Sequence, residues 1–285
     1  MKVGIAMHTT DQSIPPDELA IACEDRGIES LLFPDHSHSP TSRQTPWPGS
    51  ITGEPLPEEY SRLIDPFVAL GAAAAATTTL RIGTAVTLVA QRDVLQLAKE
   101  VATVDWLSGG RMIFGVGFGW NAEEMANHGV GMADRWAIVA EKLEAMKLLW
   151  TQDTATFSGD HVQFNESWAW PKPVQQPHPP ILIGGGWGPR LLGAVVRHAD
   201  GWMPVSSRSS IQSRIDLLHA EAARQGRDPS TLSITIADAK PDLDALRSLD
   251  GEGVERVLLS VPVGTRDETL RLLDTYGQLA RAAAG

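Results

Sequence analysis

Three histidines and one aspartate stand where they could do acid–base chemistry. His8 follows a short apolar run near the start of the chain, and Asp35, His36 and His38 follow the next one. Imidazole changes charge near neutral pH and a neighbouring carboxylate can fix its tautomer, so His36 with Asp35 is a candidate proton donor or acceptor. Two alternatives stay open: solvated loop residues without a role, and a zinc site built from the same side chains, which we favour less.

A glycine-rich run at residues 107–121, LSGGRMIFGVGFGWN, predicts a place where a ligand approaches the backbone. Five mostly apolar residues, 112–116, indicate a buried strand, and Gly117 and Gly119 follow at its end. Asn121 and Glu124, three positions apart, are typical of the paired caps at the start of a helix. We therefore expect a strand tip that makes room for a ligand.

A second glycine run, ILIGGGWGPR at residues 181–190, is typical of an anion site. Its glycines leave backbone N–H groups unobstructed, and Pro189 predicts a helix whose positive end would face a phosphate, with Arg190 adding a charge. A tight strand-to-helix turn without a ligand is the alternative. The run does not match the dinucleotide-binding fingerprint, because the helix begins too soon and no acidic residue ends the following strand.

The elements that must position these residues alternate along the chain. Apolar runs predict strands at residues 3–6, 30–33, 81–88, 112–116, 181–183, 201–205, 232–236 and 256–260. Helical period or composition predicts helices at residues 16–26, 66–77, 94–107, 135–150, 189–198, 211–225, 243–249 and 266–283. Capping residues support three helix starts: Asp65 before Pro66, Asp93 with Gln96, and Thr265 with Glu268.

Eight strands alternating with helices predict an α/β fold, an eight-stranded (β/α)8 TIM barrel formed as one domain by residues 1–285. An open doubly wound sheet is the alternative. Residues 34–64, 118–134 and 151–180 interrupt the alternation, and we expect insertions there. The first two follow strands and should lie at the C-terminal mouth, whereas the third follows a helix and contains a hairpin. Because the loops after the strands form the active face of such a barrel, the histidines and both glycine runs should share one mouth.

Composition limits the partners of the chain. A net charge of −11 over 285 residues, with scattered basic residues, argues against nucleic acid or an anionic membrane as a partner. The longest apolar run is too short to span a bilayer, and the first residues lack the apolar core of a signal peptide, so we expect a cytoplasmic protein. Cys23 is the only cysteine, which excludes an intrachain disulfide and a cysteine-based metal cluster. We expect a small-molecule substrate and no bound metal.

Five blocks of the sequence resemble the bacterial luciferase-like monooxygenase family, and in particular its branch that depends on the deazaflavin coenzyme F420. In chain order they are SLLFPDHSHSP, DPFVALGAAAAATTTLRIGTAVTLVAQRD, AKEVATVDWLSGGRMIFGVGFGWNAEEM, WPKPVQQPHPPILIGG and HADGWMP. The resemblance extends from the first strand to about Pro204. It implies a barrel that binds F420, or alternatively FMN, at its C-terminal mouth, and it implies a homodimer.

The resemblance also implies roles for individual residues. It places a non-prolyl cis peptide at Ala85–Val86 behind the cofactor ring and the cofactor phosphate on the second glycine run. Asp35 and His36 match the pair that lies at the reacting carbon in the sugar-phosphate dehydrogenases of this branch, so His36 would handle a proton. The expected cofactor-binding residues are His8, Ala85, Val86, Gly117, Phe118, Gly119, Asn121, Gly184, Gly185, Gly186 and Arg190.

The sequence therefore predicts an F420-dependent oxidoreductase that transfers a hydride between the deazaflavin and a small organic substrate. An FMNH2-dependent monooxygenase and a non-catalytic flavin- or deazaflavin-binding protein on the same scaffold are the alternatives, followed by a metal-dependent barrel hydrolase. One position departs from the branch: Trp120 stands where the sugar-phosphate dehydrogenases carry a glutamate. This difference argues against their reaction and leaves the acid–base partner of His36 open.

Overall fold

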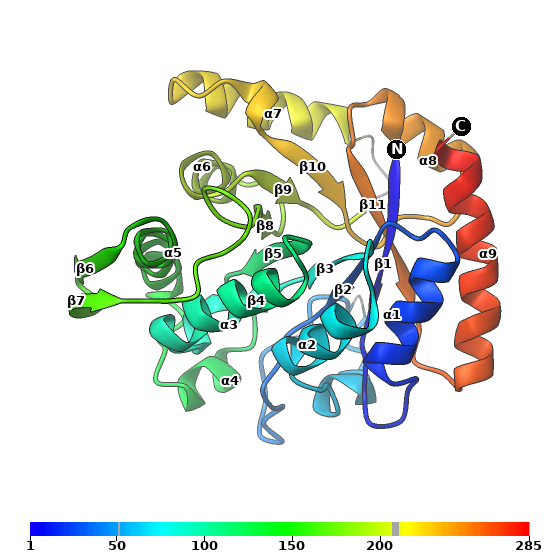
Figure 1. Ribbon diagram of the computed structural model, residues 1–285, viewed down its shortest axis with the longest axis horizontal. Coiled ribbons are helices and arrows are strands. Elements are labelled where there is room, and N and C mark those ends of the chain that lie inside the picture. The colour runs from blue at the N-terminus through cyan, green and yellow to red at the C-terminus, as the bar shows by residue number, and fades with distance from the viewer. Residues whose placement is uncertain (51, 207–210, 285) are drawn as a thin grey trace.

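The computed structural model describes residues 1–50, 52–206 and 211–284, which form a closed barrel of parallel strands (Figure 1). In this part of the chain the barrel strands are β1 (Lys2–Met7), β2 (Ser30–Phe33), β3 (Arg81–Thr84), β5 (Met112–Gly117), β8 (Ile181–Gly184), β9 (Gly201–Met203), β10 (Ser233–Ile236) and β11 (Arg256–Val261). Strand β1 pairs with β2 on one side and with β11 on the other, which closes the barrel. The predicted (β/α)8 barrel is confirmed, and the open doubly wound sheet is wrong.

The strands are apolar on both faces because both faces are covered. All four residues of β2 and all six of β5 are buried. Side chains inside the barrel form their own cluster, made of Leu32, Ile113, Leu182, Met203 and Leu258. The opposite faces of the strands join a larger core beneath the helices, the arrangement that favours continuous apolar runs over an alternating pattern.

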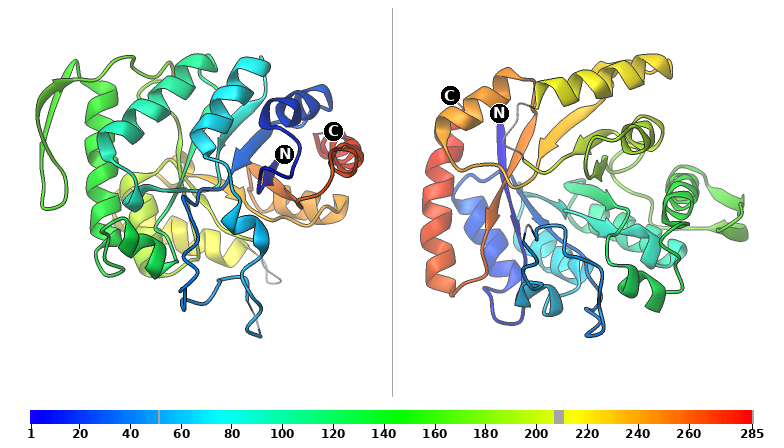
Figure 2. Two further views of the ribbon diagram at one scale, coloured as in Figure 1. Left: turned by 90° about the horizontal axis from the view of Figure 1, so that it is seen from below. Right: turned by 180° about the vertical axis from the view of Figure 1, so that it is seen from behind.

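Helices surround the strands on the outside (Figure 2). They are α1 (Pro16–Asp25), α2 (Pro66–Ala76), α3 (Val94–Leu107), α5 (Arg135–Thr151), α6 (Pro189–His198), α7 (Gln212–Arg224), α8 (Leu243–Gly251) and α9 (Arg266–Ala284), with short 3-10 turns η2 (Val89–Gln91) and η3 (Pro229–Thr231). Asp65 accepts hydrogen bonds from the N–H groups of Phe67 and Val68 and caps α2, as predicted. The predicted caps at Asp93 and at Thr265 with Glu268 are also confirmed.

Of the three segments that interrupt the alternation, two follow barrel strands and one follows a helix. Residues 34–50 and 52–64 form a long loop with the turn η1 (Glu58–Ser61), and residues 118–134 contain the short helix α4 (Ala122–Asn127). Residues 151–180 contain the predicted hairpin, β6 (Thr154–Ser158) with β7 (Gln163–Trp168), which runs beside α5 (Figure 1). The first two segments follow β2 and β5, so they lie at the carboxyl ends of the strands.

Strand β4 (Thr87–Leu88) divides the predicted strand 81–88 in two. It follows β3 after Ala85 and Val86 and pairs with β5 at Val116 and Gly117. No helix in the described residues has the length and apolar character needed to cross a membrane.

Arg111 ties the start of β5 to the end of α2 at the bottom of the barrel. Its guanidinium donates to four carbonyl oxygens and one hydroxyl, namely the carbonyls of Ala74, Thr77, Leu80 and Ser108 and the Thr77 hydroxyl.

We expect Arg111→Met to lower the free energy of unfolding by about 2–4 kcal/mol, because carbonyls shielded from water lose their donor. Urea denaturation followed by circular dichroism measures the change. The exposed Arg271→Met on α9 is the control and should change it by about 0.5 kcal/mol or less; equal losses in the two variants would contradict the role of Arg111.

Candidate active site

His36 lies at the mouth, three residues after β2, and is held by a carboxylate from the segment after β5. Its Nδ1 is 2.7 Å from Oε2 of Glu124, and the N–H of Ser37 donates to Oε1 of the same carboxylate at 3.1 Å. The Glu124 side chain is 0% exposed and that of His36 is 8% exposed. Because a buried carboxylate needs polar partners, these two contacts fix Glu124 against the loop that carries His36.

The contacts of His36 define its tautomer. Nδ1 faces the Glu124 carboxylate and therefore carries the hydrogen. Nε2 lies 3.4 Å from the indole Nε1 of Trp120, a group that can only donate, so Nε2 accepts. A neutral His36 in this arrangement presents a proton-accepting Nε2 beside Trp120, and the carboxylate behind it would stabilise the protonated ring.

Asp35 is directed away from His36 toward Arg92. Its carboxylate accepts two hydrogen bonds of 2.8 Å from the Arg92 guanidinium and one of 3.0 Å from the N–H of Leu88. Arg92 also donates to Asp65, the cap of α2. Burial lowers the pKa of Arg92, but the hydrogen bonds and charges of Asp35 and Asp65 outweigh it and raise the pKa above its usual range. Through Arg92, the Asp35 carboxylate therefore connects the end of β2 to the start of α2.

The long loop brings an aromatic residue, Tyr60, between the two histidines. Its ring centre is 5.0 Å from that of His8 and 5.3 Å from that of His36, and it lies 6.3 Å from the Trp120 ring. Burial lowers the pKa of His8 and raises the pKa of Tyr60, so both are neutral at pH 7. These four side chains form a compact polar and aromatic cluster at the mouth.

Helix α4 attaches the same loop at a second point. The Glu123 carboxylate accepts hydrogen bonds from the backbone N–H groups of Gln44 and Thr45 and from the Thr45 hydroxyl, at 2.7, 3.2 and 2.6 Å. The hydroxyl contact, followed by the N–H contacts, lowers the pKa of Glu123 to about 2. The two insertions at the mouth are therefore joined to each other by adjacent residues of one helix.

The expected cis peptide is present between Ala85 and Val86. The Val86 side chain occupies the space that side chains at Gly117 and Gly184 would need: a Cβ there would lie 2.4 Å from its Cγ2 and 2.7 Å from its Cγ1, respectively. Glycine was predicted at these two positions for contact with a cofactor, and the structure shows that the Val86 side chain also requires it. Ala85 and Val86 are partly buried and pack on the apolar cluster inside the barrel, with Gly117 and Gly184 against the Val86 side chain.

Two side chains predicted to flank a cofactor also have contacts within the protein. Phe118 stacks on Trp136 with ring centres 3.7 Å apart, and buried Asn121 accepts a hydrogen bond from the Glu124 N–H. Asn121 therefore caps α4 as predicted, but Glu124 does not complete the predicted capping pair, because its carboxylate binds at His36. Gly119 lies between them with a φ of +77°, which favours glycine.

The second glycine run forms an open loop at the start of α6. Gly185 has a φ of +137°, and a Cβ there would lie 2.5 Å from Leu191, whereas nothing lies within 4 Å of a Cβ built on Gly186 or Gly188. No side chain caps the first turn of α6. Pro189 has no N–H and the N–H of Leu191 donates to the carbonyl of Gly188, so the N–H of Arg190 is the donor that this turn offers to a ligand. Arg190 is exposed on the same turn. Open backbone, a helix N-terminus and a cation fit a phosphate group.

Sequence reasoning missed Glu124 as the partner of His36 and Tyr60 as a member of the cluster. Glu124 carries a capping pattern that hides its contact with a residue 88 positions away, and Tyr60 is an isolated aromatic in a proline-rich loop. The histidines at the mouth are also candidate zinc ligands. In the described part of the chain, no three histidine, cysteine or acidic side chains converge as they would around a metal ion.

Comparison with known proteins identifies the family of this chain. The family described as luciferase-like monooxygenase matches residues 15–241. The chain is 41% identical to an uncharacterized protein of Mycobacterium tuberculosis over 270 residues, 94% of each chain. It is 28% identical to an F420-dependent glucose-6-phosphate dehydrogenase of Amycolatopsis mediterranei over 290 residues, 99% of this chain and 80% of the relative.

A solved structure gives the same fold. The monooxygenase RslO1 of Streptomyces bottropensis superposes with a TM-score of 0.79 over 98% of both chains at 21% identity. The extent of the family match and the identity to the mycobacterial relative agree with the resemblance noted from five sequence blocks. This chain belongs to the luciferase-like monooxygenase family.

Proposed function

We propose that the protein is an F420-dependent oxidoreductase that transfers a hydride between the deazaflavin and a small organic substrate, with His36 handling the proton. The observation that carries this proposal is the buried Glu124 carboxylate on Nδ1 of His36, which leaves Nε2 as a proton acceptor at the mouth. The similarity to an F420-dependent dehydrogenase supports the choice of cofactor.

The residues around the mouth fit a flavin-shaped cofactor with a phosphate. We assign the apolar surface at Ala85, Val86, Gly117 and Gly184 to the ring, with His8 and Gly119 at its edges, and the loop from Gly184 to Arg190 to the phosphate. When bound, F420 would supply or accept the hydride at its ring. The protein contributes orientation, charge and exclusion of water.

His36 would act as a general base when an alcohol is oxidised. Nε2 takes the proton of the substrate hydroxyl, while the hydrogen on the carbon that bears this hydroxyl leaves as a hydride, which F420 would accept. Glu124 stabilises the imidazolium that forms. In the reverse direction the imidazolium returns the proton to the carbonyl oxygen. In the structure the indole N–H of Trp120 donates to Nε2, and the substrate hydroxyl would replace it as the donor. Asp35 is assigned a positioning role, because Arg92 engages its carboxylate.

We further propose a homodimer that uses α2 and α3. Helix α2 reads PFVALGAAAAA and is apolar on all sides, yet Val68 on it is 75% exposed. Leu107 on α3 is 47% exposed, and a groove of about 310 Å³ lies between the two helices. A second copy would cover this apolar face.

The cofactor assignment is tested by fluorescence titration with F420 beside FMN. Gly186→Val should weaken F420 binding about 10-fold or more, because the side chain enters the phosphate space, without a change in melting temperature since that space is open. Gly251→Val, at the end of α8, is the matched control. If the wild-type protein binds FMN but not F420 and consumes oxygen, the result supports the monooxygenase alternative instead. Binding of F420 without turnover of any tested alcohol or ketone would favour the non-catalytic alternative.

The proton-transfer assignment is tested by absorbance assays of F420 reduction with a panel of secondary alcohols. We expect His36→Ala to lower turnover about 10²- to 10⁴-fold and Glu124→Gln about 10- to 100-fold, with the F420 Kd unchanged. The double variant should be no slower than His36→Ala, because the two groups act as a unit. The control Glu166→Gln on β7 should keep full turnover. Additive losses in the double variant would contradict the pairing.

The dimer is tested by sedimentation at micromolar concentration. Val68→Glu should convert the wild-type dimer to a monomer, because it places a charge in the centre of an apolar contact. Asp216→Lys on the exposed face of α7 is the control and should leave the dimer intact. A wild-type monomer would overturn this part of the proposal.

A further inference from the structure

Two arginines flank one tryptophan beside the glycine loop. The guanidinium carbon of Arg190 lies 4.8 Å from the centre of the Trp136 ring, and that of Arg135 lies 5.9 Å from it. Trp136 stacks in turn on Phe118, the residue after β5. Helices α5 and α6 thus bring two cations to the strand tips that also carry Gly184 to Gly186, because β5 and β8 are neighbours in the barrel.

Neither guanidinium is neutralised in the described part of the chain, where no carboxylate lies within ion-pair distance of Arg135 or Arg190. Arg135 donates to the carbonyl of Met132, and its Nε is buried without a hydrogen-bond partner. Burial and then the charge of Arg190 lower the pKa of Arg135. In a chain with 35 acidic and 24 basic residues, two adjacent cations without a carboxylate indicate a place for an external anion.

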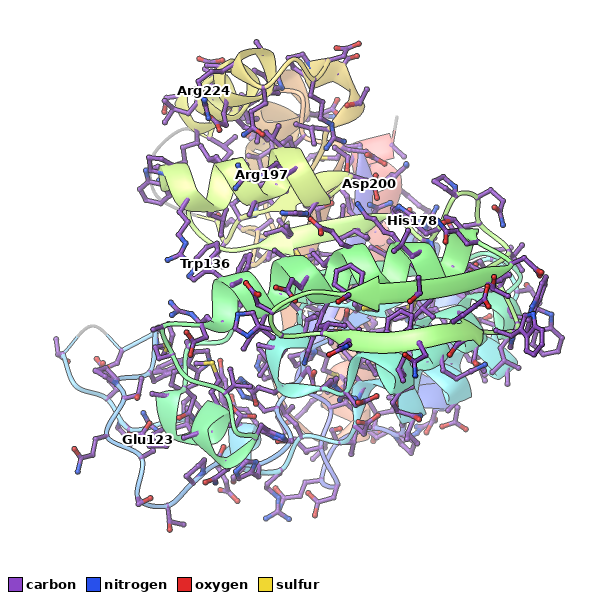
Figure 3. All side chains as sticks on the ribbon, turned by 90° about the vertical axis from the view of Figure 1, so that its left-hand side faces the viewer. Glu123, Trp136, His178, Arg197, Asp200 and Arg224 are labelled. Atoms are coloured by element: carbon purple, nitrogen blue, oxygen red, sulfur yellow. The ribbon has the colours of Figure 1, made fainter. Side chains whose placement is uncertain are left out.

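A groove lies between α5 and α6 and is lined by Trp136 and Arg190, the ring and one of the two cations described above. It has a volume of about 210 Å³, an apolar floor that includes Leu143, Ile183 and Ala194, and Arg190 and Arg197 on its polar rim. Figure 3 looks onto this face, with Trp136 labelled on α5 and Arg197 on α6 above it. An aliphatic floor with cations at the rim suits a short methylene chain that ends in a carboxylate.

We propose that Arg135, Arg190 and the groove between α5 and α6 form a second anion subsite, which binds a glutamyl carboxylate of the cofactor, beyond its phosphate and its lactyl group. The inference rests on the proposed function and deepens it. FMN ends at its phosphate and would leave Arg135 without a ligand group. F420 continues past its phosphate into a lactyl and glutamyl chain with several carboxylates, and this chain matches the two cations and the apolar floor.

The test compares two forms of the deazaflavin by fluorescence titration at low ionic strength: F420 with its glutamates, and the same molecule ending at the lactyl group. Wild-type protein should bind the glutamylated form about 10-fold more tightly. Arg135→Gln should lose this preference by weakening only the glutamylated form, and Arg135→Lys should retain most of it. Added salt should reduce the preference in the wild type, since exposed charges are screened.

Arg271→Gln makes the same charge change on α9, across the barrel from α5 (Figure 1), and should leave both affinities unchanged. Melting temperatures confirm that each variant is folded. Equal binding of the two forms by the wild type, or equal weakening of both by Arg135→Gln, would overturn the subsite while the proposed function stands. Failure of the wild type to bind either form would overturn the proposed function and the subsite with it.

Discussion

The mouth of this barrel is organised around a carboxylate that has no contact with solvent. Glu124 must be satisfied by polar groups inside the protein, and the groups it finds are the Nδ1 of His36 and the N–H of Ser37. This requirement draws the loop after β2 onto the helix after β5. The cost of leaving such a group unpaired is several times the net value of an ordinary hydrogen bond, so the pair fixes both segments together. The same contact orients the imidazole that we assign to proton transfer.

Much of the fold follows from short-range sequence patterns. The bounds of β2 and α3 agree with those predicted, because Pro34 ends the apolar run of β2 and Asp93 caps the start of α3. The predicted strand 81–88 shows where such reasoning fails. Its apolar and β-branched residues read as one strand, but β3 ends at Thr84 and β4 begins at Thr87. Only the family resemblance indicated a special backbone at Ala85 and Val86.

The site was less accessible to sequence reasoning, and the reason is geometric. Asp35 and His36 are neighbours in the chain, but successive side chains of an extended backbone point to opposite sides. Arg92 therefore binds the first, while Glu124 binds the second from another part of the barrel. A contact between residues 88 positions apart leaves no periodic trace in one sequence. The glycines at 117 and 184 were identified by their type, but the residue that requires them, Val86, became clear only from the structure.

The attachment of the loop at Gln44 and Thr45 to Glu123 has a consequence for how this scaffold can diversify. The loop after β2 is attached to Glu123, the residue adjacent to the one that orients the imidazole. A graft of residues 34–64 from a homologue, made to alter which molecules are admitted, would also disturb the helix behind His36. The loop and the imidazole are mechanically linked through α4, so an exchange of this loop between relatives requires matching changes in residues 118–134, a segment distant in the gene.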